Sequence, residues 1–422
     1  MPVLAALGGP PVRTRPFPRW PEIDPADEAA LLRALHGSYW GLHGDGEIER
    51  FEARFAEYQQ ARHAVAVANG TVALRIALLA AGIRAGDEVL VPPYTFLATA
   101  SAVAEANATP VFVDIDPDTF NLCPRAAAAA VTPRTRALIP VHIGGLPAEM
   151  DELLALARRH DLVVIEDAAH AHGAEYRGRR VGALGHLGCF SFQSSKNLTS
   201  GEGGAVVTDD PALAARVRSI HNCGRVPGGA WYEHHTISGN YRITEFQAAL
   251  LNSQLDKLEE QTQRRERNAL RLYARLRQVP GIRPQARPTY AHRHGNHLFL
   301  FHYDAAEWGV PREVFLRALE AEGIPAAPGY PLPLYRQPLF ARGDFGPYSA
   351  AFDQHPGLSY AAVRCPNCEE ICGRAGAWLY QNVLLGTPED TDDIARAFEK
   401  LHAHRADLRE LAARDPAPGK TA

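Results

Sequence analysis

Short apolar runs rich in β-branched residues alternate with alanine-rich stretches between residues 60 and 210. The short runs predict strands, and the longer stretches between them predict helices. This alternation indicates an α/β protein in which mostly parallel strands are covered by helices on both faces. The expected strands are residues 63–68, 88–91, 109–113, 137–141, 162–165, 187–191 and 204–208, and the clearest helices between them are residues 72–81, 97–106 and 148–160.

Further helical patterns flank this block, and a second set of elements follows it. The additional expected helices are residues 25–35, 46–58, 245–276, 312–322 and 388–409, and a strand is expected within residues 293–304.

The second set predicts a smaller α+β domain after the α/β domain. We expect a large domain over residues 1–265 and a small C-terminal domain over residues 266–410. Residues 411–422 are rich in Pro, Gly and Ala and predict a disordered tail.

The composition excludes several classes of protein. The formal net charge is -4 and no basic run occurs, so we expect no nucleic-acid partner. The N-terminus lacks a basic segment leading into a long apolar core, which argues against a signal peptide. Apolar runs elsewhere are too short to span a bilayer, so we expect no membrane association and a cytoplasmic location.

Six cysteines in a chain of this length do not indicate a disulfide framework. Cys365 and Cys368 have the spacing of a metal-ligand pair, but no second pair follows them. We favour a helix that begins at Cys365-Pro366 and carries Cys368 and Cys372 one turn apart on its inner face. His170 and His172 are two residues apart and would not meet on a helix, so we expect no metal site.

Sheets of this type bind ligands at the carboxyl ends of their strands, and three features of the chain lie there. Asn69-Gly70-Thr71 follows the first strand and precedes a helix, where backbone N–H groups and the Thr71 hydroxyl can hold an anion. A structural turn capped by Thr71 is the alternative. Phe96 follows the second strand and can stack on a planar cofactor or lie in the core. Asp167 ends a buried strand, where a carboxylate needs a cationic partner such as a pyridinium N–H.

Lysine is rare in this chain, and Lys196 is placed differently from the other three. Lys257 and Lys400 lie in charged helical stretches and Lys420 lies in the tail, where solvated cations are expected. Almost all other positive charge is arginine, which stays protonated. Lys196 therefore predicts primary-amine chemistry, because a desolvated ammonium can lose its proton and attack a carbonyl. Chance retention in a surface loop is the alternative.

A phosphate-binding turn, a stacking aromatic, a buried aspartate and an isolated lysine are together the parts needed to hold pyridoxal phosphate. In this interpretation Lys196 bonds to the cofactor aldehyde, and Asp167 keeps the ring nitrogen protonated so that the ring can withdraw electrons. The parts follow successive strands in order, which argues against a chance arrangement.

With these residues taken together, the chain resembles the sugar and cyclitol aminotransferases of the DegT/StrS type. The resemblance runs from about Gly8 to Leu401. It implies fold type I of the pyridoxal-phosphate-dependent transferases, the fold of aspartate aminotransferase. The matching stretches are residues 69–71, 92–96, 110–116, 166–170, 191–192 with Lys196, 201–204 and 238–242.

The resemblance also implies roles for individual residues. Lys196 is similar to the lysine that binds the cofactor covalently, whereas related dehydratases carry His at that place. Asp167 is similar to the partner of the ring nitrogen. Asn240 matches a position that reaches the phosphate of the neighbouring subunit, which implies a homodimer with shared active sites. The other matching positions are Gly70, Thr71 and Ser191 at the phosphate, Phe96 at the stacking position and His170 near the ring hydroxyl.

Within this family, four stretches are most similar to the scyllo-inosose aminotransferases and the aminohydroxybenzoate synthases. This similarity implies that an amino acid, glutamine or glutamate, donates its amino group to a cyclic polyol ketone or a keto-sugar in aminocyclitol or antibiotic biosynthesis. The four stretches are residues 17–21, 221–225, 364–366 and 378–386.

Candidate contacts to the hydroxyls of the substrate are Trp40, His43, Arg225, His297 and Tyr330. Packing within the small domain is the alternative for His297 and Tyr330.

Three other functions compete with transamination. The same cofactor could support elimination or aromatisation, as in the aminohydroxybenzoate synthases. A non-catalytic ligand sensor should carry an appended DNA-binding domain, for which we expect no room before Gly8 or after Leu401. A nicotinamide-dependent reductase should carry a glycine-rich fingerprint after the first strand, and Asn69-Gly70-Thr71 lacks it.

Overall fold

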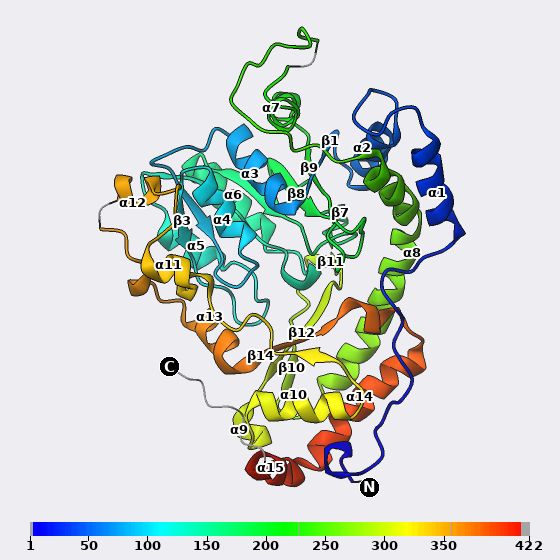
Figure 1. Cartoon of the computed structure of the whole chain (residues 1–422). Coiled ribbons are helices and arrows are strands. Elements are labelled where there is room, and N and C mark those ends of the chain that lie inside the picture. The colour runs from blue at the N-terminus through cyan, green and yellow to red at the C-terminus, as the bar shows by residue number, and fades with distance from the viewer. Residues whose placement is uncertain (1–2, 227, 356, 415–422) are drawn as a thin grey trace.

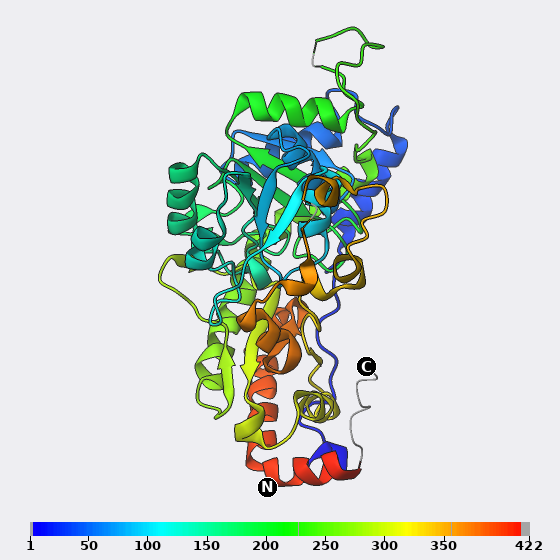
Figure 2. The same cartoon turned by 90° about the vertical axis from the view of Figure 1, so that its left-hand side faces the viewer.

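A computed structural model describes residues 3–226, 228–355 and 357–414. A large α/β part lies above a smaller α+β part in the view of Figure 1. The long helix α8 (Glu245–Leu276) extends from the large part down into the small one. Figure 2 shows the same two parts from the side.

The large part is built on a seven-stranded sheet in the order β1-β9-β8-β5-β4-β2-β3. Six of its strands run parallel, and β9 is antiparallel to both of its neighbours. The strands are β1 (His63–Val67), β2 (Glu88–Val91), β3 (Thr109–Phe112), β4 (Thr135–Leu138), β5 (Val163–Asp167), β8 (Leu187–Ser191) and β9 (Gly204–Thr208).

The expected mostly parallel sheet is confirmed, and β9 is its one reversed strand among the described residues. Residues 192–203, which link β8 to β9, contain no helix. A parallel neighbour requires a crossover connection, whereas a loop lets the chain return antiparallel beside the strand it has just left. The loop also keeps Lys196 at the edge of the sheet between the two strands.

Helices cover both faces of this sheet. Along β1, Val65 and Val67 join the core beneath α3, α4 and α7, whereas Ala64 and Ala66 join the core beneath α2, α6 and α8. Both faces are therefore buried, as the nearly continuous apolar strands predict. The helices of this part are α1 (Pro25–His36), α2 (Glu47–Tyr58), α3 (Gly70–Ala80), α4 (Ala98–Glu105), α5 (Pro124–Ala130), α6 (Met150–His160) and α7 (Pro211–His221), together with α8.

The small part has its own four-stranded antiparallel sheet in the order β10-β12-β14-β13. A separate three-stranded sheet, β11-β6-β7, joins a strand from this part to two short strands of the large part. The strands are β10 (Ile282–Pro284), β12 (Leu298–Tyr303), β13 (Ala326–Ala327), β14 (Gly376–Tyr380), β11 (Ala291–Arg293), β6 (Glu175–Tyr176) and β7 (Arg179–Arg180). The helices are α9 (Ala305–Trp308), α10 (Arg312–Ala321), α14 (Pro388–Ala403) and α15 (Arg405–Arg414). Three further helices come between α10 and α14 in the sequence but pack against the core of the large part, namely α11 (Pro338–Arg342), α12 (Ala350–Gln354) and α13 (Pro366–Glu370).

The C-terminal helix differs from the expectation in two ways. Residues 388–409 do not form one helix, because the chain turns at His404 between α14 and α15. The disordered tail expected from residue 411 is wrong for residues 411–414, which belong to α15. The rest of that segment, residues 415–422, lies outside the described residues.

The cysteine-rich segment forms the helix that the sequence predicts. Cys365 precedes the first residue of α13, and Pro366 opens the helix. Cys368 and Cys372 are buried, with their sulfur atoms 3.8 Å apart. Within the described ranges, no group of three His, Cys, Asp or Glu side chains is arranged to hold a metal ion. None of the described helices is both long and apolar enough to cross a membrane.

The first residues of the chain pack on the small part instead of the large one (Figure 1). Leu4 joins the apolar core of the small part. The fully buried carboxylate of Glu322 accepts hydrogen bonds from the backbone N–H groups of Ala5 at 2.9 Å and Val12 at 3.0 Å. The same carboxylate pairs with the Lys400 ammonium at 2.8 Å. We call residues 4–20 the N-terminal strap, because this segment ties the small part to the large one.

The chain also crosses between the two parts in the opposite direction. Tyr335, Phe340 and Tyr360 follow the small sheet's strand β13 in sequence but pack into the core of the large part. Residue 265, where we expect the division between domains, lies inside α8. The division therefore stays a prediction.

We predict that Lys400→Met lowers the free energy of unfolding by about 3 kcal/mol, because it leaves the buried Glu322 carboxylate without its cation. Urea denaturation measures the effect. Arg374→Met is the matched control, since Arg374 pairs with Glu370 on the exposed surface of one helix and its removal should leave the unfolding curve unchanged. An unchanged curve for Lys400→Met would mean that the two backbone hydrogen bonds alone satisfy Glu322.

Candidate active site

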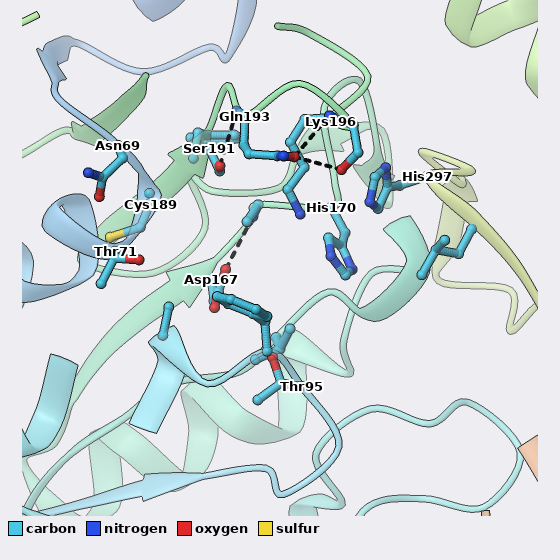
Figure 3. A pocket seen from close by; sticks show the side chains of 18 of the residues that line it. Asn69, Thr71, Thr95, Asp167, His170, Cys189, Ser191, Gln193, Lys196 and His297 are labelled. Atoms are coloured by element: carbon cyan, nitrogen blue, oxygen red, sulfur yellow. Dashed lines mark hydrogen bonds between the residues drawn. The ribbon is translucent and has the colours of Figure 1, made fainter. Parts of the chain in front are cut away.

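A pocket of about 960 Å³ lies where the carboxyl ends of the parallel strands face the small part. Its walls come from the segments after β1, β2, β5 and β8, from the ends of β12 and β14, and from the N-terminal strap. Figure 3 shows Asn69 and Thr71 on one side, Lys196, His170 and His297 on the other, and Asp167 between them. The expected site residues that line this pocket are Gly70, Thr71, Phe96, Asp167, His170, Ser191, Lys196, His297 and Tyr330.

One end of the pocket has the features of an anion site. Gly70 and Thr71 form the first turn of α3, where unpaired N–H groups and the helix dipole favour negative charge. A Cβ atom at Gly70 would lie 2.7 Å from the Cβ of Ser191, so a larger residue would push α3 away from the end of β8. The close approach brings the first turn of α3 and Ser191 to the same end of the pocket.

The residue that caps α3 at this end is not Thr71, as the alternative of a structural turn would require. Asn69, and not Thr71, caps α3, because its side chain accepts the N–H of Val72 at 2.9 Å. The Thr71 hydroxyl makes no hydrogen bond with the part of the chain that the structure describes, and it faces the pocket. It is therefore available to a ligand.

Asp167 is buried at the end of β5 without a cation. Its carboxylate accepts hydrogen bonds from the Thr99 hydroxyl at 2.8 Å and from the Ala169 N–H at 3.2 Å. Since the Thr99 hydrogen is used in this way, Thr95 donates to Thr99 across 3.0 Å. No salt bridge to Asp167 forms among the described residues, and desolvation raises the pKa of its carboxyl group. A ligand that brings a positive charge next to the carboxylate would offset the cost of its desolvation.

Phe96 lies at the pocket with 62% of its surface exposed. The alternative that it is a core residue is therefore wrong. An aromatic ring left this open on a pocket wall offers a planar surface to a ligand.

Lys196 projects into the same pocket from the loop between β8 and β9 (Figure 3). The loop turns where the backbone N–H of Lys196 donates to the backbone carbonyl of Gln193 at 2.9 Å. In the described part of the chain, the amine has no hydrogen-bond or salt-bridge partner. Desolvation lowers its pKa to about 8, against the opposing influence of the Asp167 charge. The amine therefore lies inside a pocket and not on a surface loop.

Two imidazoles flank the lysine, and their neighbours fix which nitrogens carry hydrogen. The Nδ1 atom of His170 accepts the Gly144 N–H at 3.3 Å, so its hydrogen is on Nε2. Asn197 donates to the Gly295 carbonyl at 2.7 Å, which directs its oxygen to His297 Nδ1 at 3.3 Å. His297 thus donates from Nδ1 and presents a free Nε2 lone pair.

The ring centres of His170 and His297 lie 4.4 Å apart. Desolvation holds the pKa of both well below the usual range, and the nearby Lys196 acts in the same direction. Both imidazoles are therefore neutral near pH 7, with one donor and one acceptor available at the pocket.

Tyr330 lines the pocket from the small part and meets Tyr94 and Trp378 edge-on, with ring centres 5.3 and 5.2 Å away. It is thus both packed and exposed to the pocket, as is His297. Burial raises the pKa of the Tyr330 phenol, so its hydroxyl stays protonated and can donate a hydrogen bond.

Trp40, His43, Arg225 and Asn240 do not line the pocket of their own chain, so their expected roles stay predictions. Trp40 packs on Phe246 near the start of α8, and His43 pairs with Asp45. Arg225 and Asn240 lie at the two ends of a segment after α7 that projects from the body of the large part (Figures 1 and 2). The sequence alone does not show that these residues lie outside the pocket, because the pocket is formed by the tertiary structure.

Sequence reasoning missed Trp20, Trp378, Gln381 and Asn382, which line the side of the pocket nearest the small part. Trp20 lies 174 positions before Ser194, to whose carbonyl its indole N–H donates at 3.1 Å. No local pattern reports a contact over such a separation. The only available signal was that residues 17–21 and 378–386 belong to the stretches with family resemblance.

Comparisons with known proteins agree with this geometry. A family model described as the DegT/DnrJ/EryC1/StrS aminotransferase family matches residues 22–372. The L-glutamine:2-deoxy-scyllo-inosose aminotransferase of Streptomyces paromomycinus is 42% identical over 429 residues, covering 96% of this chain and 98% of that protein. The 3-amino-5-hydroxybenzoate synthase of Amycolatopsis mediterranei is 38% identical over 376 residues, covering 88% and 94%. A crystal structure of 3-amino-5-hydroxybenzoic acid synthase superimposes with a TM-score of 0.84 at 36% identity, covering 93% of this chain and 100% of that one.

We predict that the Lys196 amine of the cofactor-free protein titrates near pH 8, well below the 10.5 of an ordinary lysine. In Asp167→Asn the midpoint should move lower still, because the carboxylate charge no longer favours the ammonium. The pH dependence of labelling by an amine-directed reagent, read at Lys196 by mass spectrometry, measures both midpoints. Lys196→Ala gives the background from the other lysines. A wild-type midpoint near that of ordinary lysine would contradict desolvation of the amine.

Proposed function

The chain belongs to the DegT/DnrJ/EryC1/StrS family of pyridoxal-phosphate-dependent aminotransferases, and we propose that it moves the amino group of glutamine or glutamate to a cyclic polyol ketone. A keto-sugar is the wider class of acceptor, and the setting is aminocyclitol or antibiotic biosynthesis. The observation that carries this proposal is the pocket in which an isolated, desolvated Lys196 amine faces a buried Asp167 that lacks a cation. The identity to a glutamine-dependent 2-deoxy-scyllo-inosose aminotransferase supports the choice of donor and acceptor.

The residues of the pocket fit pyridoxal phosphate. Asp167 would hold the protonated ring nitrogen, which supplies the cation that its buried carboxylate lacks. Phe96 would lie against the ring, and His170, with hydrogen on Nε2, would donate to the ring hydroxyl. The first turn of α3, with Thr71 and Ser191, would hold the phosphate.

When bound, the cofactor supplies an aldehyde that accepts amines and a ring that withdraws electrons. Lys196 would hold the aldehyde until the donor amine displaces it. The freed amine, with a pKa of about 8, can take a proton at neutral pH. It would take the proton from the carbon that bears the donor nitrogen and deliver it to the former aldehyde carbon of the cofactor. In the second half of the reaction it would move a proton in the reverse direction, onto the former carbonyl carbon of the acceptor. The neutral His297 Nε2 and the Tyr330 hydroxyl would orient the hydroxyls of the acceptor.

We predict that Lys196→Ala abolishes transamination and the visible absorbance of the covalently bound cofactor. Loss of the general base alone lowers the rate by roughly 10²–10⁴-fold. Glutamine-dependent amination of 2-deoxy-scyllo-inosose measures turnover. Lys257→Arg is the control, because Arg can keep the pairing of Lys257 with Asp24 and Asp27, and none of these three residues lines the pocket. A Lys196→Ala protein that is yellow and active would overturn the assignment.

We also infer a homodimer in which each chain completes the pocket of the other. Asn240 and Arg225 belong to the segment after α7, in which Asn240 forms a β-bridge with Asn222, and neither residue lines the pocket of its own chain. The same segment exposes Trp231 at 78% and Tyr232 at 76%, and Trp40 is 54% exposed beside α8. Clustered exposed aromatics of this kind are typical of surfaces covered by a partner. Asn240 would then reach the phosphate of the neighbouring subunit, and Arg225, Trp40 and His43 would lie near its substrate.

This arrangement predicts complementation between two inactive variants. Lys196→Ala and Asn240→Ala should each have little activity alone. Mixed, unfolded and refolded together, they should recover about a quarter of the wild-type activity, since half of the dimers then hold one intact site. Refolding Lys196→Ala with Lys196→Ala, Asn240→Ala double mutant is the control and should recover nothing. No recovery in the first mixture would contradict sites shared between subunits.

Elimination or aromatisation without net amino transfer is the second candidate. The TM-score of 0.84 with 3-amino-5-hydroxybenzoic acid synthase is the observation that favours it. The two reactions differ in their need for a donor, because transamination consumes one glutamine for each product and elimination consumes none. Product formation in the absence of any amino acid would favour elimination.

A further inference from the structure

The indole of Trp20 is held in the wall of the pocket by contacts on two sides. It is half-buried and comes from the N-terminal strap. Its N–H donates to the Ser194 carbonyl at 3.1 Å, in the loop that carries Lys196. The guanidinium carbon of Arg265 lies 4.8 Å from the centre of the ring, within the range of a cation–π contact. A long aromatic side chain fixed in this way cannot swing out of the pocket without breaking both contacts.

Arg265 is an unusual support for an aromatic ring. It is fully buried, and its Nε atom donates to the Gln381 side-chain oxygen at 2.8 Å. Its two terminal nitrogens have no hydrogen-bond partner among the described residues. No salt bridge compensates its charge in that part of the chain, and desolvation lowers its pKa to about 9. Burial of a guanidinium is costly, and the two groups that it holds, Trp20 and Gln381, both line the pocket.

We propose that Trp20 is the platform on which the ring of the acceptor stacks, and that it selects cyclitol ketones whose hydroxyls are all equatorial. This inference rests on the proposed function. In the chair form of such a ring, every hydroxyl lies near the ring plane, and C–H bonds cover both faces. An indole face is apolar and carries partial negative charge, so it favours contact with a face made of C–H bonds.

An axial hydroxyl on the contacting face would oppose this stacking. Its oxygen would lose water on meeting the indole and would find no hydrogen-bond partner there, which weakens binding. An apolar surface rejects an added hydroxyl by roughly 100-fold. Trp20 therefore discriminates against epimers at the ring carbons, whereas it has no comparable contact to make with an open-chain amino acid such as glutamine.

The polar groups next to Trp20 suit hydroxyls that point outward in the ring plane. Gln381 uses its oxygen for Arg265, and its amide nitrogen makes no hydrogen bond with the described residues. Asn382 donates its amide to the Pro18 carbonyl at 2.9 Å, which leaves its oxygen as an acceptor. Both residues line the pocket. The wall thus combines one apolar platform with a donor and an acceptor at its side, the usual composition of a site for a polyol.

The test separates the two halves of the reaction in the holoenzyme. Glutamine alone reports the first half through loss of the visible absorbance of the cofactor. The amine-loaded enzyme mixed with 2-deoxy-scyllo-inosose, or with an epimer that carries one axial hydroxyl, reports the second half. Calorimetric titration with the aminated cyclitol product gives a measure of binding that does not depend on turnover.

We expect Trp20→Ala to react with glutamine at the wild-type rate. Its kcat/KM for the all-equatorial ketone should fall roughly 10- to 100-fold, and its discrimination against the axial epimer should fall with it. Affinity for the product should fall in parallel. Trp20→Phe keeps an aromatic face and should retain most of the discrimination, although it loses the hydrogen bond to Ser194. Trp308→Phe, in the core of the small part, is the matched control and should behave as the wild type.

Three results would overturn the inference. Trp20→Ala could keep the full discrimination between epimers, or it could slow both halves equally. Trp20→Phe could be as impaired as Trp20→Ala, which would assign the effect to the hydrogen bond and not to the ring face. A wild-type protein that does not react with glutamine or glutamate would instead overturn the proposed function, and the inference with it.

Discussion

The buried end of strand β5 determines the geometry on which the rest of the site depends. Glu166 is fully buried there, and its two oxygens accept the backbone N–H groups of Gly182 at 2.7 Å, Leu184 at 2.7 Å and Gly185 at 2.6 Å. The same carboxylate meets His142 Nε2 at 2.9 Å. His142 Nδ1 accepts an N–H from the backbone, so its Nε2 carries the hydrogen and donates. Four donors around one carboxylate fix the end of the strand in position.

Asp167 follows directly, and because side chains alternate along a strand it points to the opposite face from Glu166. It receives two hydrogen bonds and no cation among the described residues, so that burial raises the pKa of its carboxyl group. The pKa of Lys196 shifts in the opposite direction, since desolvation lowers the pKa of its amine. Both charges are thus disfavoured in the empty pocket. A ligand with a cationic ring nitrogen and an aldehyde relieves both, and the neutral His170 and His297 add no competing charge.

The sequence predicted those parts of the site that depend on local order along the chain. Gly70 comes just after a strand, whereas Asp167 and Ser191 are the last residues of theirs. The carboxyl ends of parallel strands must meet at one edge of the sheet, so the proximity of these residues was predictable. The sequence could not show which of the two adjacent carboxylates, Glu166 or Asp167, has a full set of hydrogen-bond donors. Three of the four donors to Glu166 are backbone N–H groups of a later turn. It could not show the direction of β9, which depends on the loop that precedes it. Trp40, His43 and Arg225 were candidate substrate contacts, and that they do not line the pocket of their own chain depends on the tertiary structure.

The pocket wall that contains Trp20, Trp378, Gln381 and Asn382 is assembled from segments that are distant in the sequence. Arg13 in the strap pairs with Asp390 at 2.6 Å and with Asp393 at 2.9 Å in α14, and Glu322 holds the strap on its other side. These buried contacts fix the path of the chain up to Trp20, where the strap meets the loop of Lys196. The side of the pocket proposed to hold the cofactor is thus built into the edge of one sheet, whereas the side proposed to face the substrate depends on three separate segments, namely the strap, α8 and the end of β14. Replacements in any of these three segments can therefore reshape this wall of the pocket while Asp167 and the first turn of α3 stay in place.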